Sequence, residues 1–244
     1  MSYTALVLHG GGGPATVGPI ASHLAGTFDV IAPTHPGWND TAPVDGDTIQ
    51  ALAARYLDDL TSRGVRDALI VGSSIGGWIA AEIAILDAAR DKADRVIGQL
   101  VLIDTVGADV PGHPLRDVSA LTPRQLAEFA WADPDRGFTD PATLTPERLA
   151  TIRGNMTALA LYAGGSHTND PQLLARLAAV SLPTLVIWGD ADRMVTVDYG
   201  RAVASAVPNS TFVIIENAGH LPHLEQPQST FDALDEFVAL TPGR

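Results

Sequence analysis

The sequence predicts an α/β fold built on a doubly wound, mostly parallel sheet of six strands. Short, almost continuously apolar segments alternate with longer amphipathic ones, which is typical of parallel strands covered by helices on both faces. The chain has 244 residues, a length that one α/β domain can fill. Because 46% of the residues are hydrophobic and only 18% are charged, the composition also indicates a large buried core.

Six segments have the composition of buried strands, and four others have helical periodicity. In the first helical segment, apolar residues recur at the spacing of one helix face, and Gly64 closes the pattern. The predicted strands are TALVLHG (4–10), FDVIAPT (28–34), DALIVG (67–72), VIGQLVLIDT (96–105), PTLVIWG (183–189) and STFVIIENAG (210–219), and the predicted helices are 48–64, 75–89, 197–206 and 227–239.

Residues 110–180 interrupt this alternation. They contain many prolines and no convincing strand, and three stretches favour helices: TPRQLAEFAWA, TPERLATIRGNMTALALYA and DPQLLARLAAV. Each opens on Thr-Pro or Asp-Pro, which is typical of an N-cap followed by proline in the first helical position. Insertions of this length between strands usually cover a site. We therefore expect a helical lid over 110–180, inserted after the fourth strand into a single domain whose core is 1–109 and 181–244.

Charge and cysteine content exclude several classes of protein. With 28 acidic and 15 basic residues and no Lys/Arg-rich run, the chain is not expected to bind nucleic acid. The absence of cysteine excludes disulfides, thiol catalysis and cysteine-ligated metals. The chain shows no signal-peptide pattern and no apolar run of about 18 residues, so we expect a cytoplasmic protein that does not bind membranes.

The stretch LIVGSSIGGWIA (69–80) contains the pattern Gly-x-Ser-x-Gly between a predicted strand and a predicted helix. This context is typical of a nucleophile elbow, a sharp turn that exposes a serine hydroxyl at the carboxyl end of a sheet. Gly72 and Gly76 occupy the two positions where a side chain would collide. Ser74 is therefore the candidate nucleophile, and Ser73 lies in the wrong phase for that role. The alternative is an ordinary glycine-rich connection.

A serine nucleophile needs a base and an acid from loops at the same edge of the sheet. His220 directly follows the last predicted strand, in ENAGHLPHLEQP, and is the candidate base. VIWGDADRMV follows the fifth strand, and its Gly-x-x-Asp spacing favours Asp192 as the acid, whereas Asp190 is a candidate cap for that turn. Asp104, at the end of the fourth strand, is the alternative acid. His9 lies in HGGGG, where we expect it to brace the loop.

The glycines at 10–13 leave backbone N–H groups unshielded after the first strand. A phosphate-binding loop is excluded because no Lys-Ser/Thr follows. Paired with the N–H of Ile75, the N–H of Gly11 or Gly12 is a candidate oxyanion hole.

The order Ser74, Asp192, His220, together with His9-Gly10 and GHLPHLEQP, resembles the α/β-hydrolase superfamily over nearly the whole chain. The similarity is greatest to small lidded serine hydrolases: carboxylesterases, enol-lactonases and carbon–carbon bond hydrolases. It implies cleavage of a small-molecule carboxylic ester or lactone through an acyl-enzyme, with no cofactor and no metal. The alternatives are a carbon–carbon bond hydrolase or lyase on the same triad, or a non-catalytic ligand-sensing protein of the same fold.

Three features depart from the family pattern. Thr34, in THPGWNDT, replaces the acid that often precedes this Pro-Gly, and Leu221 occupies the place where carbon–carbon bond hydrolases often carry Trp. The predicted sheet also lacks the family's N-terminal hairpin, because the first strand begins almost at Met1. We therefore expect 28–34 to be an edge strand, which favours either pairing with a second copy in a homodimer or cover by another segment of the chain.

Large apolar side chains in the predicted lid and next to the predicted loops are candidates for the substrate pocket. For most of them, packing within the core of the lid is the alternative. The candidates are Trp38, Phe129, Trp131, Phe138, Met156, Leu159, Tyr162 and Leu221.

Overall fold

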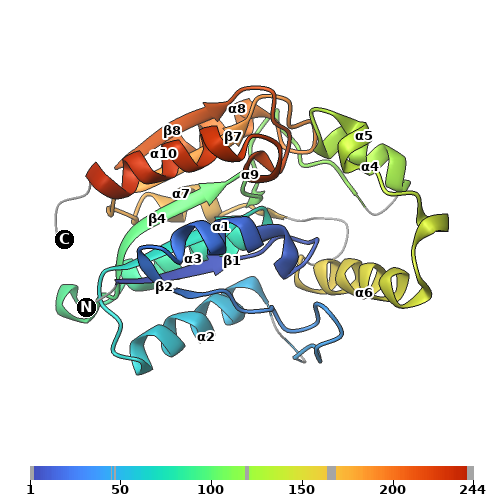
Figure 1. Cartoon of the computed structure of the whole chain (residues 1–244). Helices are drawn as coiled ribbons and strands as arrows, with labels where there is room; N and C mark the ends of the chain where they lie inside the picture. Colours follow the sequence, from blue (N-terminus) through green and yellow to red (C-terminus); the bar gives the residue numbers. More distant parts are fainter. Residues whose placement is uncertain (1–2, 45, 47, 119–120, 164–168, 241–244) are drawn as a thin grey trace.

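Six parallel strands form one sheet in the computed structural model of the protein, which describes residues 3–44, 46, 48–118, 121–163 and 169–240 (Figure 1). The strand order is β2-β1-β3-β4-β7-β8, and every neighbouring pair is parallel. This confirms the predicted sheet. Its strands are β1 (Tyr3–Leu8), β2 (Phe28–Ile31), β3 (Ala68–Ser73), β4 (Ile97–Ile103), β7 (Thr184–Gly189) and β8 (Ser210–Ile215).

Helices cover both faces of the sheet, and the four predicted outside 110–180 are present with ends within two residues of the prediction. The helix α1 was not predicted, because its seven residues are too few to show a clear period. These helices are α1 (Gly18–Leu24), α2 (Ile49–Ser62), α3 (Ile75–Ala88), α8 (Val197–Ala206) and α10 (Pro227–Leu240), with the short η1 (Pro14–Val17), η2 (Lys92–Asp94) and α9 (Pro222–Glu225) between them.

Alternate residues of each strand pack against different helices. In β1, Leu6 and Leu8 belong to the apolar cluster that contains residues of α2, α3 and α8. Ala5 and Val7 belong to the cluster on the other face, with residues of α1 and α10. This period of two explains why the strands are apolar throughout: both faces of the sheet are buried.

The segment 110–180 is mainly helical, as predicted. The prolines at the starts of α4 and α6 follow Thr122 and Thr145, whose side chains accept hydrogen bonds from backbone N–H groups of the first turn. The expectation that it contains no strand was wrong, because residues 169–170 pair with 107–108 in a second, two-stranded sheet. The elements are β5 (Gly107–Ala108), α4 (Pro123–Ala130), α5 (Pro134–Gly137), η3 (Pro141–Thr143), α6 (Pro146–Tyr162), β6 (Asn169–Asp170) and α7 (Leu173–Leu177).

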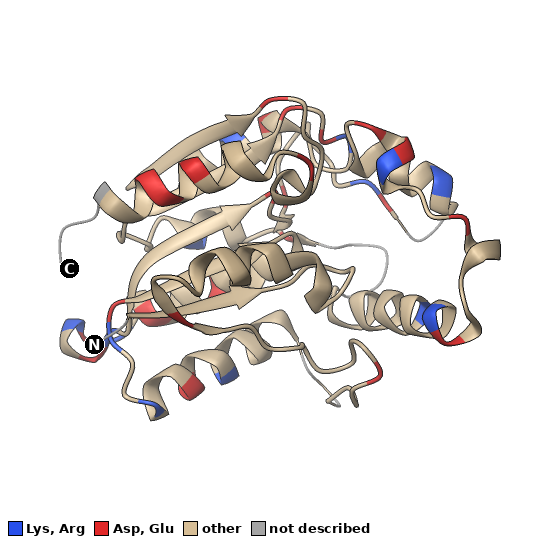
Figure 2. Cartoon of the chain, viewed as in Figure 1, with Lys and Arg blue, Asp and Glu red and all other residues tan. Residues whose placement is uncertain are grey.

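Only part of this segment stands away from the sheet. Figure 1 shows α4 and α5 at the same end of the molecule as α6, and Figure 2 shows that α4 and α5 carry both acidic and basic residues. In contrast, α7 contacts α3 and α8, and its Leu173 and Leu177 are buried in the main core. The lid function of 110–180 stays a prediction, and residues 119–120 and 164–168 of it lie outside the described range.

The strand β2 lies at the edge of the sheet, and no antiparallel strand precedes it among the described residues. Val30 and Ile31 pack against opposite core clusters, and Asp29 is exposed in the middle of the strand. A charge on a short edge strand discourages pairing with a strand of another chain. Nothing in the fold of one chain tests the homodimer, which stays a prediction. None of the described helices is long and apolar enough to cross a membrane.

Three buried histidines hold loops at the carboxyl end of the sheet. His9 donates from Nδ1 to the carbonyl of Gly10 and accepts the backbone N–H of His35 on Nε2. His35 donates from Nε2 to the carbonyl of His9 and accepts the Tyr56 hydroxyl on Nδ1. Burial lowers the pKa of His9 to about 4 and that of His35 well below its usual value.

His223, in α9, donates from Nε2 to the carbonyl of Thr16 at 2.9 Å, and its Nδ1 has no partner among the described residues. Burial lowers its pKa to about 4. In the folded protein this histidine stays neutral down to about pH 4, whereas in the unfolded chain it takes up a proton below about pH 6.5. Between these pH values, protonation of the unfolded chain favours unfolding. The stabilising contribution is therefore complete above about pH 6.5 and is lost as the pH falls toward 4.

We expect His223→Gln to reduce this acid sensitivity, because the glutamine amide can replace the Nε2 donor and does not titrate. Between pH 7.5 and pH 5, the wild type should lose about 2 kcal/mol more unfolding free energy than the variant. Urea unfolding of both proteins at the two pH values measures this difference. A difference between the proteins that does not change with pH would contradict the assignment of a neutral, buried His223.

Candidate active site

Ser74 lies between the end of β3 and the start of α3, in the sharp turn that the Gly-x-Ser-x-Gly pattern predicts. Its φ of 57° and ψ of −122° place it in a region that side-chain-bearing residues rarely adopt. A Cβ on Gly72 would lie 2.2 Å from the carbonyl oxygen of Gly76, and one on Gly76 would lie 2.3 Å from that of Leu8. Glycine at these two positions lets strand and helix approach closely enough to form the turn.

The structure brings Ser74, His220 and Asp192 together from three loops that follow β3, β8 and β7. His220 Nε2 lies 2.9 Å from Ser74 Oγ, and His220 Nδ1 lies 2.7 Å from Asp192 Oδ2. An ionised Asp192 can only accept, so Nδ1 carries the proton and Nε2 accepts from the serine hydroxyl. The other carboxylate oxygen of Asp192 accepts the backbone N–H groups of Met194 and Val195. The histidine is thus held with its basic nitrogen on the serine.

Asp104, the alternative acid, lies beside Asp192 and is fully buried. Its Oδ1 accepts the backbone N–H of Gly189, and its Oδ2 has no partner within the described residues. Burial, and then the neighbouring Asp192 carboxylate, raise the pKa of Asp104 well above its usual value. Its surroundings therefore favour the neutral form of the Asp104 carboxyl group.

Side-chain atoms of Asp104, Asp192 and His220 all lie within 4.8 Å of one another, a spacing that could also hold a metal ion. His220 Nδ1 and Asp192 Oδ2 are hydrogen-bonded to each other, and Asp104 Oδ1 accepts the backbone N–H of Gly189. Hydrogen bonding therefore accounts for this cluster, and the geometry favours Asp192 over Asp104 as the partner of His220. Asp190 instead accepts the backbone N–H of Ala218 at 3.3 Å, consistent with a role in the turn.

The glycine loop 10–13 is fixed through its carbonyl groups. The carbonyl of Gly10 accepts from His9 Nδ1, that of Gly11 accepts from Trp38 Nε1 at 2.9 Å, and that of Gly12 accepts from Asn155 Nδ2 at 3.3 Å. Each peptide unit is planar and trans, so its N–H points opposite to the carbonyl that is held. Gly11 and Gly12 both line the cavity at Ser74.

The second expected oxyanion donor, the N–H of Ile75, belongs to the first turn of α3. The first N–H groups of a helix have no intrahelical partner, and the helix dipole adds partial positive charge there. This end of α3 therefore suits a negatively charged oxygen next to Ser74.

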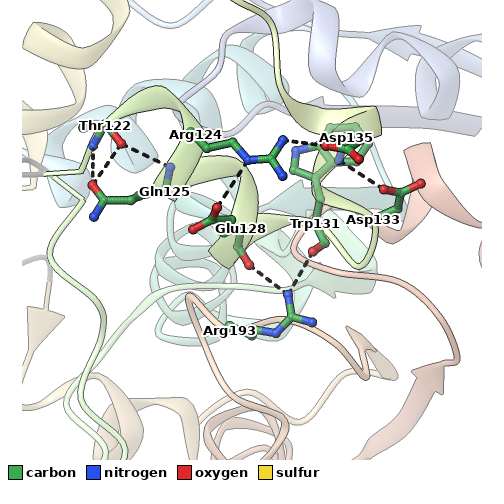
Figure 3. Close-up of polar contacts among 8 residues, drawn as sticks. All are labelled: Thr122, Arg124, Gln125, Glu128, Trp131, Asp133, Asp135 and Arg193. Atoms are coloured by element: carbon green, nitrogen blue, oxygen red, sulfur yellow. Dashed lines mark hydrogen bonds and ion pairs between the residues drawn. The ribbon is translucent and has the colours of Figure 1, made fainter.

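The loops that carry His220 and Asp192 are bonded to the end of α4, a feature that the sequence analysis missed. Arg193, the residue after Asp192, donates from Nη1 to the carbonyls of Glu128 (2.8 Å) and Trp131 (3.1 Å), as Figure 3 shows. The backbone N–H of His220 donates to the carbonyl of Ala130 at 2.7 Å. The buried Glu225 carboxylate accepts the N–H groups of Gly219 and Ala132. No pattern in the sequence marks these long-range contacts.

A cavity of about 240 Å³ opens at Ser74 and His220 between α4 and α6. Four of the eight predicted pocket residues line it: Trp131, Met156, Leu159 and Leu221. The other lining residues are Gly10, Gly11, Gly12, Thr16, Ser74, Val118, Leu126, Ala130, Ile152, Asn155, Met194 and His220.

The other four predicted pocket residues do not line this cavity. Trp38 and Tyr162 are buried side by side in the core, with ring centroids 5.4 Å apart, and Trp38 holds Gly11 instead of substrate. Phe129 lies under the guanidinium of Arg116, and Phe138 lies near that of Arg124. In the sequence, apolar character alone could not distinguish residues that pack in the core from residues that line the pocket.

Comparisons with known proteins identify the family of this chain. The model of the "Alpha/beta hydrolase family" matches residues 5–233. The chain is 31% identical to the dihydrolipoyllysine-residue acetyltransferase component of the acetoin cleaving system of Cupriavidus necator, over 95% of this chain and 62% of that protein, so it spans less than two thirds of that relative.

Two further relatives match over most of their length. A 2-hydroxy-6-oxononadienedioate/2-hydroxy-6-oxononatrienedioate hydrolase of Cupriavidus pinatubonensis is 26% identical, over 96% of this chain and 86% of the relative. A 3-oxoadipate enol-lactonase of Acinetobacter baylyi is 26% identical, over 90% and 82%. Because the family model matches almost the whole chain, this chain belongs to the alpha/beta hydrolase family.

Proposed function

We propose that the protein is a serine hydrolase that cleaves a carboxylic ester or a lactone through an acyl-enzyme. The observation that carries the proposal is the continuous chain of hydrogen bonds from Ser74 through His220 to Asp192. Ser74, at one end of this chain, has a strained backbone and lines an apolar cavity. This is the arrangement by which a weakly acidic hydroxyl becomes a nucleophile at neutral pH.

In the proposed reaction, Ser74 Oγ attacks the substrate carbonyl carbon while its proton passes to His220 Nε2. The carbonyl oxygen becomes an oxyanion that accepts N–H groups from Ile75 and from Gly11 or Gly12. When the intermediate collapses, His220 Nε2 returns the proton to the leaving oxygen. A water then repeats the sequence on the acyl-enzyme, and Asp192 stabilises the imidazolium in both halves.

A second candidate is hydrolysis of a carbon–carbon bond on the same residues, favoured by the similarity to the Cupriavidus pinatubonensis hydrolase. The same triad would then assist the departure of a carbon leaving group. Turnover of a simple alkyl ester, with a burst of alcohol equal to the enzyme concentration, supports the ester proposal. It also separates an enzyme from a protein that only binds ligands.

We also propose that α4, α5 and α6 form the lid over the cavity.

Ser74→Ala should abolish labelling by a fluorophosphonate probe and lower turnover by about 10⁴-fold or more, because Ser74 Oγ is the hydroxyl that is hydrogen-bonded to His220 Nε2. In-gel fluorescence and ester hydrolysis measure the two effects.

Ser73→Ala provides the matched control, since Ser73 Oγ is buried and has no hydrogen-bond partner among the described residues. This variant should keep its labelling. If labelling survived in Ser74→Ala and vanished in Ser73→Ala, the nucleophile would have to be reassigned.

Asp192→Asn should lower kcat by about 10⁴-fold, because an amide at this position favours the wrong histidine tautomer. Asp104→Asn should cost far less, since His220 Nδ1 is bonded to Asp192 and Asp104 Oδ1 accepts the backbone N–H of Gly189. Steady-state kinetics of the two variants checks this contrast. The reverse order of effects would identify Asp104 as the acid.

A further inference from the structure

We propose that an ester substrate binds with a short acyl group on one side of Ser74 and a large, uncharged, apolar alcohol on the other. This inference rests on the proposed function and assigns a side of the site to each part of an acyclic ester. It arises from two cavities of unequal size that meet at Ser74.

The larger cavity lies between α4 and α6 and has a volume of about 240 Å³, and the second has a volume of about 60 Å³. Both are lined by Ser74, Val118, Leu159 and Met194, so the nucleophile lies where they meet. The residues that line only the smaller cavity are Ile75, Val106, Leu115, Arg116 and Val195.

The position of His220 decides which cavity receives the leaving alcohol. The leaving oxygen takes its proton from His220 Nε2, so it must come within hydrogen-bond distance of that nitrogen. His220 lines the larger cavity and not the smaller one. The alcohol therefore extends into the larger cavity.

The remaining substituents of the reacting carbon can then be placed. The oxyanion lies between donors of both cavities, because Gly11 and Gly12 line the larger and Ile75 lines the smaller. Once the oxyanion and the alcohol are assigned, the acyl chain is left with the smaller cavity.

Volume limits the length of the acyl chain. The smaller cavity has about a quarter of the volume of the larger one, about 60 Å³ against about 240 Å³. It therefore suits the shorter of the two chains of the ester, such as an acetyl group.

Charge limits the chemistry of the alcohol. No described residue that lines the larger cavity carries a charged side chain other than His220 when protonated. A carboxylate in this cavity would lose its hydration without a cation in return. Arg116 lines only the smaller cavity, and its exposed guanidinium lies 3.8 Å from the centroid of the Phe129 ring.

The test compares hexyl acetate with ethyl hexanoate, two isomers that differ only in which side of the ester carries the long chain. By pH-stat titration, kcat/KM for hexyl acetate should be at least about 10-fold higher, since one methylene too many in a fitted pocket already costs that much. Equal values, or a preference for ethyl hexanoate, would overturn this assignment while leaving the serine hydrolase intact. If neither ester reacted and Ser74 also failed to take the fluorophosphonate label, the proposed function itself would be wrong.

Two leucine truncations provide a matched pair. Leu115 lines only the smaller cavity, and Leu126 lines only the larger. Leu115→Ala should raise kcat/KM for ethyl hexanoate relative to hexyl acetate by about 10-fold, because it makes room for the acyl chain. Leu126→Ala should lower kcat/KM for hexyl acetate without raising that for ethyl hexanoate. Exchange of the two effects between the variants would show that the cavities are assigned the wrong way round.

Discussion

The strained backbone of Ser74 is the constraint on which the rest of the site depends. A residue in this conformation costs about 1–3 kcal/mol, and it persists only where its surroundings hold it. Here the Ser74 N–H donates to the carbonyl of Ile103 at 2.9 Å, and the Ser74 carbonyl accepts the N–H groups of Gly77 and Trp78. The strand β4 and the first turn of α3 thus fix the turn from both sides. Because α3 begins at Ile75, directly after the serine, the N–H of Ile75 has no partner within the helix.

The electrostatics of the site follow from three acidic side chains buried around one histidine. Asp192 faces His220 Nδ1 and takes two backbone N–H groups on its other oxygen, which suits an ionised carboxylate. Glu225 is used differently, because it accepts the N–H groups of Gly219 and Ala132 and so joins the histidine loop to the end of α4. Asp104 has one backbone donor, and its burial beside Asp192 raises its pKa well above the usual value. One carboxylate therefore faces the imidazole, and the acid behind it is shifted toward its neutral form.

Sequence patterns predicted the parts of this structure that local rules determine. The six strands follow from apolar runs, and the turn at Ser74 follows from glycines at two positions where a Cβ would collide with backbone. The spacing of Asp192 and His220 after their strands placed both at the edge of the sheet, because parallel strands end together. In contrast, the pocket wall could not be predicted, since Trp38 and Met156 are both large and apolar. Only the packed structure shows that one holds Gly11 and the other lines the cavity.

The walls of the larger cavity are bonded to the loops that carry the chemistry. On one side, Arg193 and the N–H of His220 hold the end of α4, whose Leu126 and Ala130 line the cavity. On the other side, Asn155 of α6 donates to the carbonyl of Gly12 and accepts the N–H of Asn39. The shape of the pocket and the position of the reacting groups are therefore coupled through a few hydrogen bonds. A displacement of α4 or α6 that changed the space for substrate would also move His220 or the glycine loop, so these helices affect turnover as well as substrate binding.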